Sequence, residues 1–132
     1  MNTLKLARRL GFSLIIWSLA SIVVGAILLL IAIPVLQGIG LQALLWGIID
    51  MIIAVFGVFR AKDQTATKAA RFLRINVYLD IVYQVVGVLL IVFLWQDAFL
   101  LGNGIGIIIQ GAFLFVLDLY FYRRFTALSV AD

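Results

Sequence analysis

Four long apolar runs constrain the fold of this chain more than any other feature. The runs cover residues 10–35, 41–59, 75–95 and 104–122. A helix that crosses a bilayer needs about 20 mainly apolar residues, whereas strands of a membrane barrel alternate between apolar and polar residues. We therefore expect an all-α fold, an integral membrane bundle of four transmembrane helices. It should form one transmembrane domain over residues 1–132.

The composition agrees with a membrane protein and excludes several kinds of chemistry. Hydrophobic residues make up 66% of the chain and charged residues 12%, against about 45–50% and about 25% in soluble domains. The chain has no Cys, His or Glu. Thiol and imidazole catalysis, haem ligation and most zinc sites are thereby excluded, and we expect no cofactor and no metal.

The segments between the runs predict two antiparallel hairpins. Only a few residues separate the first run from the second and the third from the fourth, and we expect Pro34 and Gly38 to end the first helix. The central loop, residues 60–74, is basic. We expect it to extend the third helix along anionic lipid head groups.

The basic residues predict the orientation in the membrane. All ten lie before the first run, in the central loop or after the fourth run: Lys5, Arg8, Arg9, Arg60, Lys62, Lys68, Arg71, Arg74, Arg123 and Arg124. By the positive-inside rule, the loop and both termini are cytoplasmic. A cleaved signal peptide is disfavoured because the first apolar run is too long. Basic residues confined to membrane boundaries do not indicate nucleic-acid binding.

The two hairpins are weakly similar in sequence. At an offset of 62, Val23-Val24-Gly25 aligns with Val85-Val86-Gly87, and at an offset of 64, Gly47 aligns with Gly111. The similarity is typical of a parallel internal repeat, although apolar sequences also align by chance. Each run further has a seam of small residues, which marks contacts between helices rather than with lipid. We expect a compact bundle with its acids inside, assembled as a homo-oligomer.

Polar residues inside the runs are the candidate functional residues. Asp50 precedes Arg60 by ten residues, which places it about 15 Å inside the membrane, near the midplane. Gln84 and Ser18 lie at a similar depth, and Gln110 lies further from the basic residues. No Lys or Arg occurs in any run. Asp50 must then be protonated, hydrated, hydrogen-bonded to Gln84 or Ser18, or bound to a cation.

Asp80 and Asp118 lie closer to the basic residues, about 8–9 Å inside. We expect them to form a polar network on the cytoplasmic side with Arg74, Arg123 and Asn76. Two acids at one depth are also found in intramembrane aspartyl proteases, but the residues that accompany the acids of such enzymes are absent.

Three stretches carry a resemblance to a known family: Trp46-Gly47-Ile48-Ile49-Asp50, Ile75-Asn76 with Leu79-Asp80, and Gly104-Ile105-Gly106-Ile107-Ile108-Ile109-Gln110-Gly111 with Asp118. They resemble a family of short, uncharacterised bacterial four-helix membrane proteins, classed as a domain of unknown function. The resemblance covers most of the chain and implies residence in a bacterial inner membrane, without a known activity. Small multidrug carriers, also of four helices, depend on a Glu in the first helix, where this chain has Ser18 and Ser21.

Two functional interpretations remain open. The first is a small transport-type protein, not an enzyme, in which Asp50 responds to a proton or a cation, with Gln84, Gln110 and Ser18 as further candidates. The second is an accessory or scaffold membrane protein whose buried acids only hold helices together. A lipid- or peptide-processing enzyme is a weaker third because His, Cys and Glu are missing.

Overall fold

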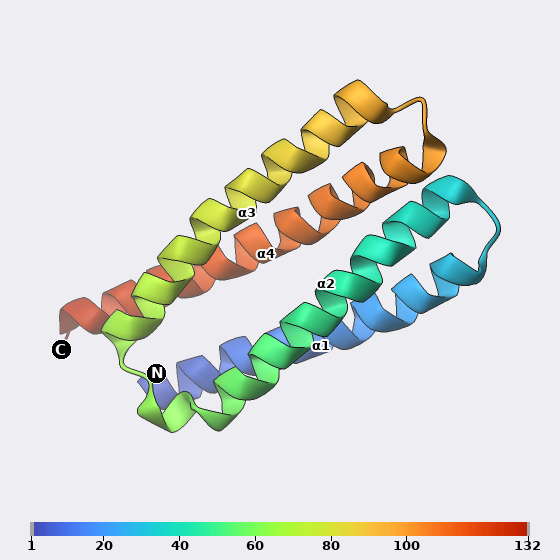
Figure 1. The fold of residues 1–132 in the computed structure, drawn as a ribbon. Coiled ribbons are helices and arrows are strands. Elements are labelled where there is room, and N and C mark those ends of the chain that lie inside the picture. The colour runs from blue at the N-terminus through green and yellow to red at the C-terminus, as the bar shows by residue number, and fades with distance from the viewer. Residues whose placement is uncertain (1, 132) are drawn as a thin grey trace.

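The computed structural model describes residues 2–131 and consists of four long helices (Figure 1). They are α1 (Thr3–Leu30), α2 (Pro34–Phe59), α3 (Ala66–Leu94) and α4 (Ala98–Ala131), with a short 3₁₀ turn, η1 (Ala61–Asp63), between α2 and α3. Residues 2–131 contain no strand. All four helices are long and apolar enough to cross a membrane. The prediction of an all-α chain with four such helices is confirmed.

Three of the helices begin at residues whose side chains cap them. The side chains of Asn2, Thr65 and Asp97 each accept a hydrogen bond from the backbone N–H three residues further on, at 2.8, 3.1 and 3.0 Å. Such caps satisfy backbone donors that have no partner in the first turn of a helix. The capping residues therefore fix where α1, α3 and α4 begin.

The prediction that Pro34 and Gly38 end the first helix is wrong. The helix α1 ends at Leu30, and Pro34 is the first residue of α2. Proline is well suited to the first turn of a helix, because its missing N–H would have no partner there and its φ is already helical. In the central loop, residues 60–74, the helix α3 begins at Ala66, so most of this segment extends the third helix as expected.

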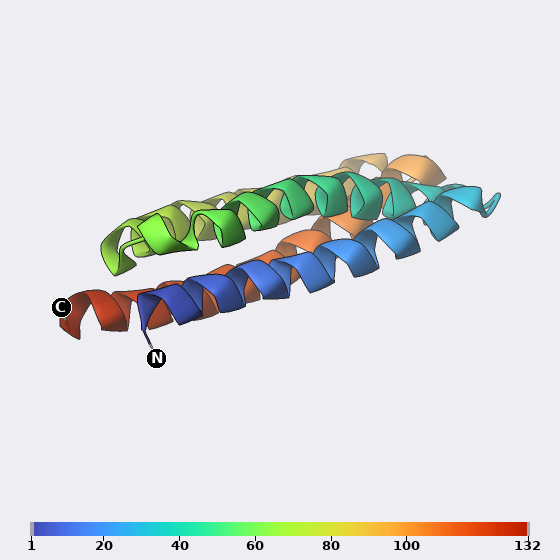
Figure 2. The same cartoon turned by 90° about the horizontal axis from the view of Figure 1, so that it is seen from below.

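The helices form two hairpins, α1–α2 and α3–α4, that meet mainly through α2 and α4. Figure 1 shows both chain ends and the η1 turn at one end of the molecule, which we call the basic end because every Lys and Arg lies at or near it. The two hairpin turns lie at the opposite end. Figure 2 shows that α2 and α3 are separated from α1 and α4 at the basic end and approach them toward the opposite end.

Within each hairpin, a pair of glycines lets the two helices approach closely. A Cβ atom on Gly25 would lie 2.7 Å from the carbonyl oxygen of Gly40, and one on Gly87 would lie 3.1 Å from that of Gly104. Gly25 and Gly87 are related by the offset of 62, and Gly40 and Gly104 by that of 64. The equivalent contacts support the interpretation of the hairpins as a repeat.

Glycines also join the hairpins to each other at the opposite end. A Cβ atom on Gly38 of α2 would collide with the backbone of Phe99 and Asn103 in α4, and one on Gly102 would collide with the backbone of Val35. Backbone therefore lies directly against backbone where α2 and α4 begin. No larger residue fits there without separating the helices.

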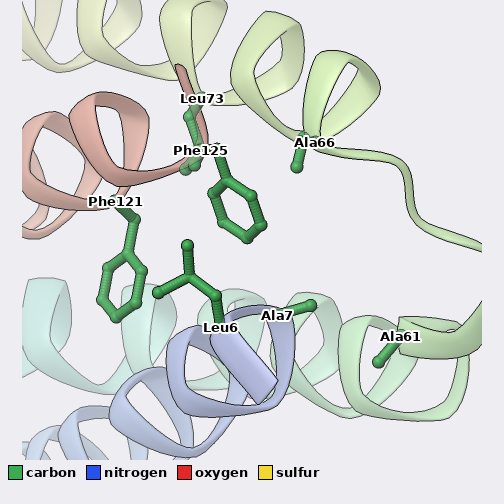
Figure 3. Packing of buried hydrophobic residues seen from close by; sticks show 8 residues of the cluster. Leu6, Ala7, Ala61, Ala66, Leu73, Phe121 and Phe125 are labelled. Atoms are coloured by element: carbon green, nitrogen blue, oxygen red, sulfur yellow. The ribbon is translucent and has the colours of Figure 1, made fainter. Parts of the chain in front are cut away.

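At the basic end, large side chains and not glycines lie between the helices. Figure 3 shows the side chain of Leu6 pointing toward the rings of Phe121 and Phe125. These residues belong to a buried cluster with five others: Ala7, Ala61, Ala66, Ala69 and Leu73. The phenyl rings fill the space between the helices, which lie further apart at this end than at the opposite end (Figure 2).

Candidate functional site

Three acidic side chains from three helices are buried in the bundle. Asp50 on α2 is 5% exposed, Asp80 on α3 is 3% exposed and Asp118 on α4 is 5% exposed. Each lies on the packed side of its helix, as the seams of small residues predict. Acids buried to this degree are rare unless they are paired or serve a function.

The carboxyl groups of Asp80 and Asp118 lie next to each other across the contact between α3 and α4, within reach of a hydrogen bond. Because a carboxylate only accepts hydrogen bonds, such a bond requires a proton on one of the two groups. Asp50 is close enough to interact with both through charge. The Oδ2 atoms of Asp50 and Asp80 are buried without a hydrogen-bond partner among the described residues.

Asp80 and Asp118 lie next to each other. The network that we expect them to form with Arg74, Arg123 and Asn76 stays a prediction. Arg74 lines a separate cleft between α3 and α4, and Arg123 is exposed. Long arginine side chains near a membrane boundary extend toward water, which carries them away from buried acids.

A cavity of about 340 Å³ lies at the basic end and is lined by residues of all four helices. Its wall is mainly apolar, with Phe56 and Phe72 among the larger side chains. Its polar residues are Arg60, Gln64, Asn76 and Asp118. Asn76 and Asp118 therefore line one cavity, and the arginine that lines it with them is Arg60.

The buried amides connect helices rather than reaching Asp50. Gln110 accepts a hydrogen bond from Trp17 Nε1 at 3.0 Å and donates one to Ser21 Oγ at 3.3 Å. Gln84 Nε2 donates to the carbonyl oxygen of Ile108 at 3.1 Å. Ser18 Oγ is buried and finds no hydrogen-bond partner in the described chain.

A second cavity, of about 200 Å³, lies nearer the opposite end. It is lined by residues of α1, α2 and α4, including Trp17, Ser21 and Gln110. Along α2, the residues that line this cavity are Ile39 and Ala43, whereas those that line the first are at 52–60. Asp50 therefore lies between the two cavities in the order of the helix.

The acids do not form a recognisable metal centre. Over residues 2–131, no three His, Cys, Asp or Glu side chains are grouped closely enough to hold a metal ion. The site offers instead a pair of adjacent carboxyl groups, a third carboxyl group nearby and a cavity at Asp118.

Sequence comparison assigns the family. The profile of a family of unknown function, DUF6992, matches residues 13–119. The chain belongs to this family. The predicted resemblance to an uncharacterised family is confirmed, and the matched range of this DUF6992 member contains all three buried acids. No curated protein and no solved structure matches the chain.

Several residues of the site in this DUF6992 member were not predicted from its sequence. Trp17 Nε1 donates a hydrogen bond to Gln110 Oε1, and the Trp17 ring stacks on Phe113 with ring centroids 3.7 Å apart. Asn103 Oδ1 accepts a hydrogen bond from Gln42 Nε2 at 2.8 Å. The sequence does contain a signal for the contacts of Gln110. Trp17 and Ser21 are spaced so that both lie on one face of α1, where one side chain can reach both.

Proposed function

We propose that this protein is a small membrane protein of the transport type whose buried carboxyl groups bind and release a proton or a monovalent cation. The observation that carries the proposal is the position of Asp50. It is 95% buried, its Oδ2 atom has no partner among the described residues, and it lies along α2 between the residues of two cavities.

The acid pair supplies a route to Asp50 from the basic end. Asp118 lines the larger cavity and lies next to Asp80, and a hydrogen bond between the two carboxyl groups would require a proton. A proton that enters this cavity would reach Asp118 first, then Asp80 and then Asp50. All four apolar runs lack Lys and Arg, so a proton or a bound cation must balance the charge of the acids.

The placement in the cell follows from the basic residues. We propose residence in a bacterial inner membrane, with both termini and the η1 turn in the cytoplasm, because the basic end has the charge that the positive-inside rule assigns to that side. We propose assembly as a homo-oligomer and no enzymatic activity.

Infrared spectroscopy of the protein reconstituted in lipid tests the proton-binding step. Protonated carboxyl groups give a carbonyl stretching band that carboxylates lack, and we expect part of this band to disappear as the pH is raised. The Asp50→Asn variant should lose the part contributed by Asp50. Addition of sodium or potassium ions should shift the titration of that part if a cation competes with the proton.

The Asp97→Asn variant is the matched control. Asp97 is exposed and caps α4, and an asparagine oxygen can accept the same hydrogen bond from Leu100 N. The control should lose only the signal of an exposed acid and should keep proton flux into vesicles that contain a pH-sensitive dye. If Asp50→Asn retained both the wild-type carboxyl signal and the wild-type flux, the proposal would be overturned.

A scaffold protein is the second candidate, and the amide contacts favour it. Gln42, Gln84 and Gln110 all use their side chains to join different helices. On this interpretation Asp50 is a further interhelical contact, and its carboxyl signal would not change with pH. Asp50→Asn would then preserve assembly, whereas Asp50→Leu would disrupt it, as measured by cross-linking and by stability in detergent.

A further inference from the structure

A polar cleft of about 270 Å³ lies between α3 and α4 at the basic end, apart from the buried acids. Six polar side chains line it: Thr67, Arg71 and Arg74 from α3, and Tyr122, Thr126 and Ser129 from α4. None of the described residues that line it is acidic. The cleft is therefore a positively charged site rich in hydroxyl groups.

The spacing of these residues explains why they meet. On each helix the three residues follow one another at steps of four and three, which puts them on one face. The two faces are turned toward each other, because the hydroxyl groups of Thr67 and Ser129 are hydrogen-bonded at 3.0 Å. Thr67, the first of the three residues on α3, and Ser129, the last of the three on α4, thus join the two sides of the cleft.

The chemistry of the cleft fits a phosphate group. A guanidinium group is always charged and presents several donors in a plane, which suits the oxygens of a phosphate. The hydroxyl groups add neutral donors around the two arginines. The Oγ1 atom of Thr126 is buried and makes no hydrogen bond within the described chain, so the site has an unused donor.

The depth of the cleft favours a lipid as the source of the phosphate. Arg74 lies at the boundary of the third apolar run, and Thr67 is seven residues further out, or about 10 Å along the helix. The head-group layer of a bilayer is roughly 5–8 Å thick on each side. The cleft therefore extends across the layer in which lipid phosphates lie.

We propose that the cleft between α3 and α4 binds the phosphate group of an anionic phospholipid. This inference is independent of the proposed function, since none of its residues belongs to the acid cluster. It predicts a bound lipid at a defined place instead of a general attraction of the basic end to the membrane surface.

Binding of fluorescent phospholipids to the purified full-length protein in detergent tests this inference. Wild-type protein should bind labelled phosphatidylglycerol more tightly than labelled phosphatidylcholine. The double variant Arg71→Gln/Arg74→Gln should weaken binding of phosphatidylglycerol about tenfold or more, because it removes two charged donors. Thr126→Val, which keeps the shape of the side chain, should weaken binding by a smaller factor.

The matched control is the double variant Arg8→Gln/Arg9→Gln. Both residues are exposed on α1 at the basic end, so the control removes the same charge from the same end of the molecule. It should leave the preference for phosphatidylglycerol intact. Thermal unfolding of every variant checks that the fold is retained.

Two outcomes would overturn the inference. Equal weakening by the two arginine pairs would mean that only general charge attraction operates. Displacement of the labelled lipid by glycerol phosphate or inorganic phosphate at low millimolar concentration would mean that the cleft is a site for soluble phosphate and that a lipid is not its ligand.

Discussion

Asp80 and Asp118 lie next to each other, and a hydrogen bond between their carboxyl groups requires a proton on one of the two. The pair can therefore hold at most one negative charge while the bond persists. Two carboxylates side by side would repel each other, and Arg60 is the basic residue that lines the cavity at Asp118. A shared proton would remove this repulsion.

An amide should replace one carboxyl group of this pair far better than an apolar side chain does. Asp80→Asn should change the free energy of unfolding by less than about 1 kcal/mol, since the amide can donate to Asp118, whereas Asp80→Leu leaves Asp118 unpaired at a cost of about 1–3 kcal/mol. Unfolding in mixed detergent micelles measures both. Asp63→Leu, at an exposed acid of η1, should have little effect.

Equal destabilisation by Asp80→Asn and Asp80→Leu would contradict a shared proton. A large loss from Asp63→Leu would show that the measurement responds to any added apolar surface.

For single residues, the sequence predicts the level at which a side chain lies along the bundle but not the neighbour that it faces. The spacing of Asp80 and Asp118 from Arg74 and Arg123 predicts that the acids lie at one level, and they meet there. Their partner could not be predicted, because a small rotation of a helix about its axis decides whether a side chain faces a neighbouring acid or the membrane surface. The cavity at Asp118 depends on four helices at once, and no single helix carries a signal for it.

At the scale of elements, the hairpins have equivalent contacts beyond their glycine pairs. A Cβ atom on Gly47 would meet the Ile22 side chain at 2.8 Å, and one on Gly111 would meet the Gln84 side chain at 2.5 Å. Ile22 and Gln84 are related by the offset of 62, and the glycines by that of 64. The second hairpin thus has a polar side chain where the first has an apolar one.

Two glycines of the first hairpin should respond in opposite ways to alanine. At Gly25 a Cβ atom would lie 2.6 Å from the backbone nitrogen of Leu44, so Gly25→Ala should destabilise the protein by about 1–3 kcal/mol. At Gly57 a Cβ atom meets nothing within 4 Å, and Gly57→Ala should be neutral or stabilise by up to about 1 kcal/mol. Reversible unfolding in mixed micelles measures the difference.

Destabilisation of the same size by both alanines would contradict the close approach at Gly25. The loss would then reflect glycine in the helix generally and not a contact between α1 and α2.

The helices themselves were predictable because apolar runs of this length have no other stable structure in lipid. The residues at which the helices begin and end were less predictable. Pro34 has two meanings in a helix, a stop in the interior and a favourable start in the first turn. Only the three-residue turn after Leu30 decides between them, and its residues are as apolar as those of the helices on either side.

At the scale of the whole molecule, all basic residues lie at one end and both hairpin turns at the other (Figure 1). The chain has no cysteine, so a single introduced cysteine can report its side of the membrane without interference. Lys62 at the basic end and Gln96 in the turn before α4 are both exposed.

We expect Gln96→Cys to react with a membrane-impermeant maleimide in intact spheroplasts. Lys62→Cys should react only after the membrane is made permeable, because the orientation that we propose puts the basic end in the cytoplasm. The reverse pattern would invert the orientation, and reaction of both without permeabilisation would contradict a single crossing, by α3, between the two positions.

The unequal packing of the two ends has a mechanical consequence. Where α2 and α4 begin, backbone rests on backbone, and the contact cannot shorten or slide without collision. That contact can serve as a pivot for the hairpins, with the 26 residues of α2 as a lever arm of about 39 Å. A rotation of roughly 5° about the pivot would move the far end of α2 by about 3 Å. A displacement of that size, about the width of a water molecule, would occur at the basic end, where Asp118 lines the larger cavity.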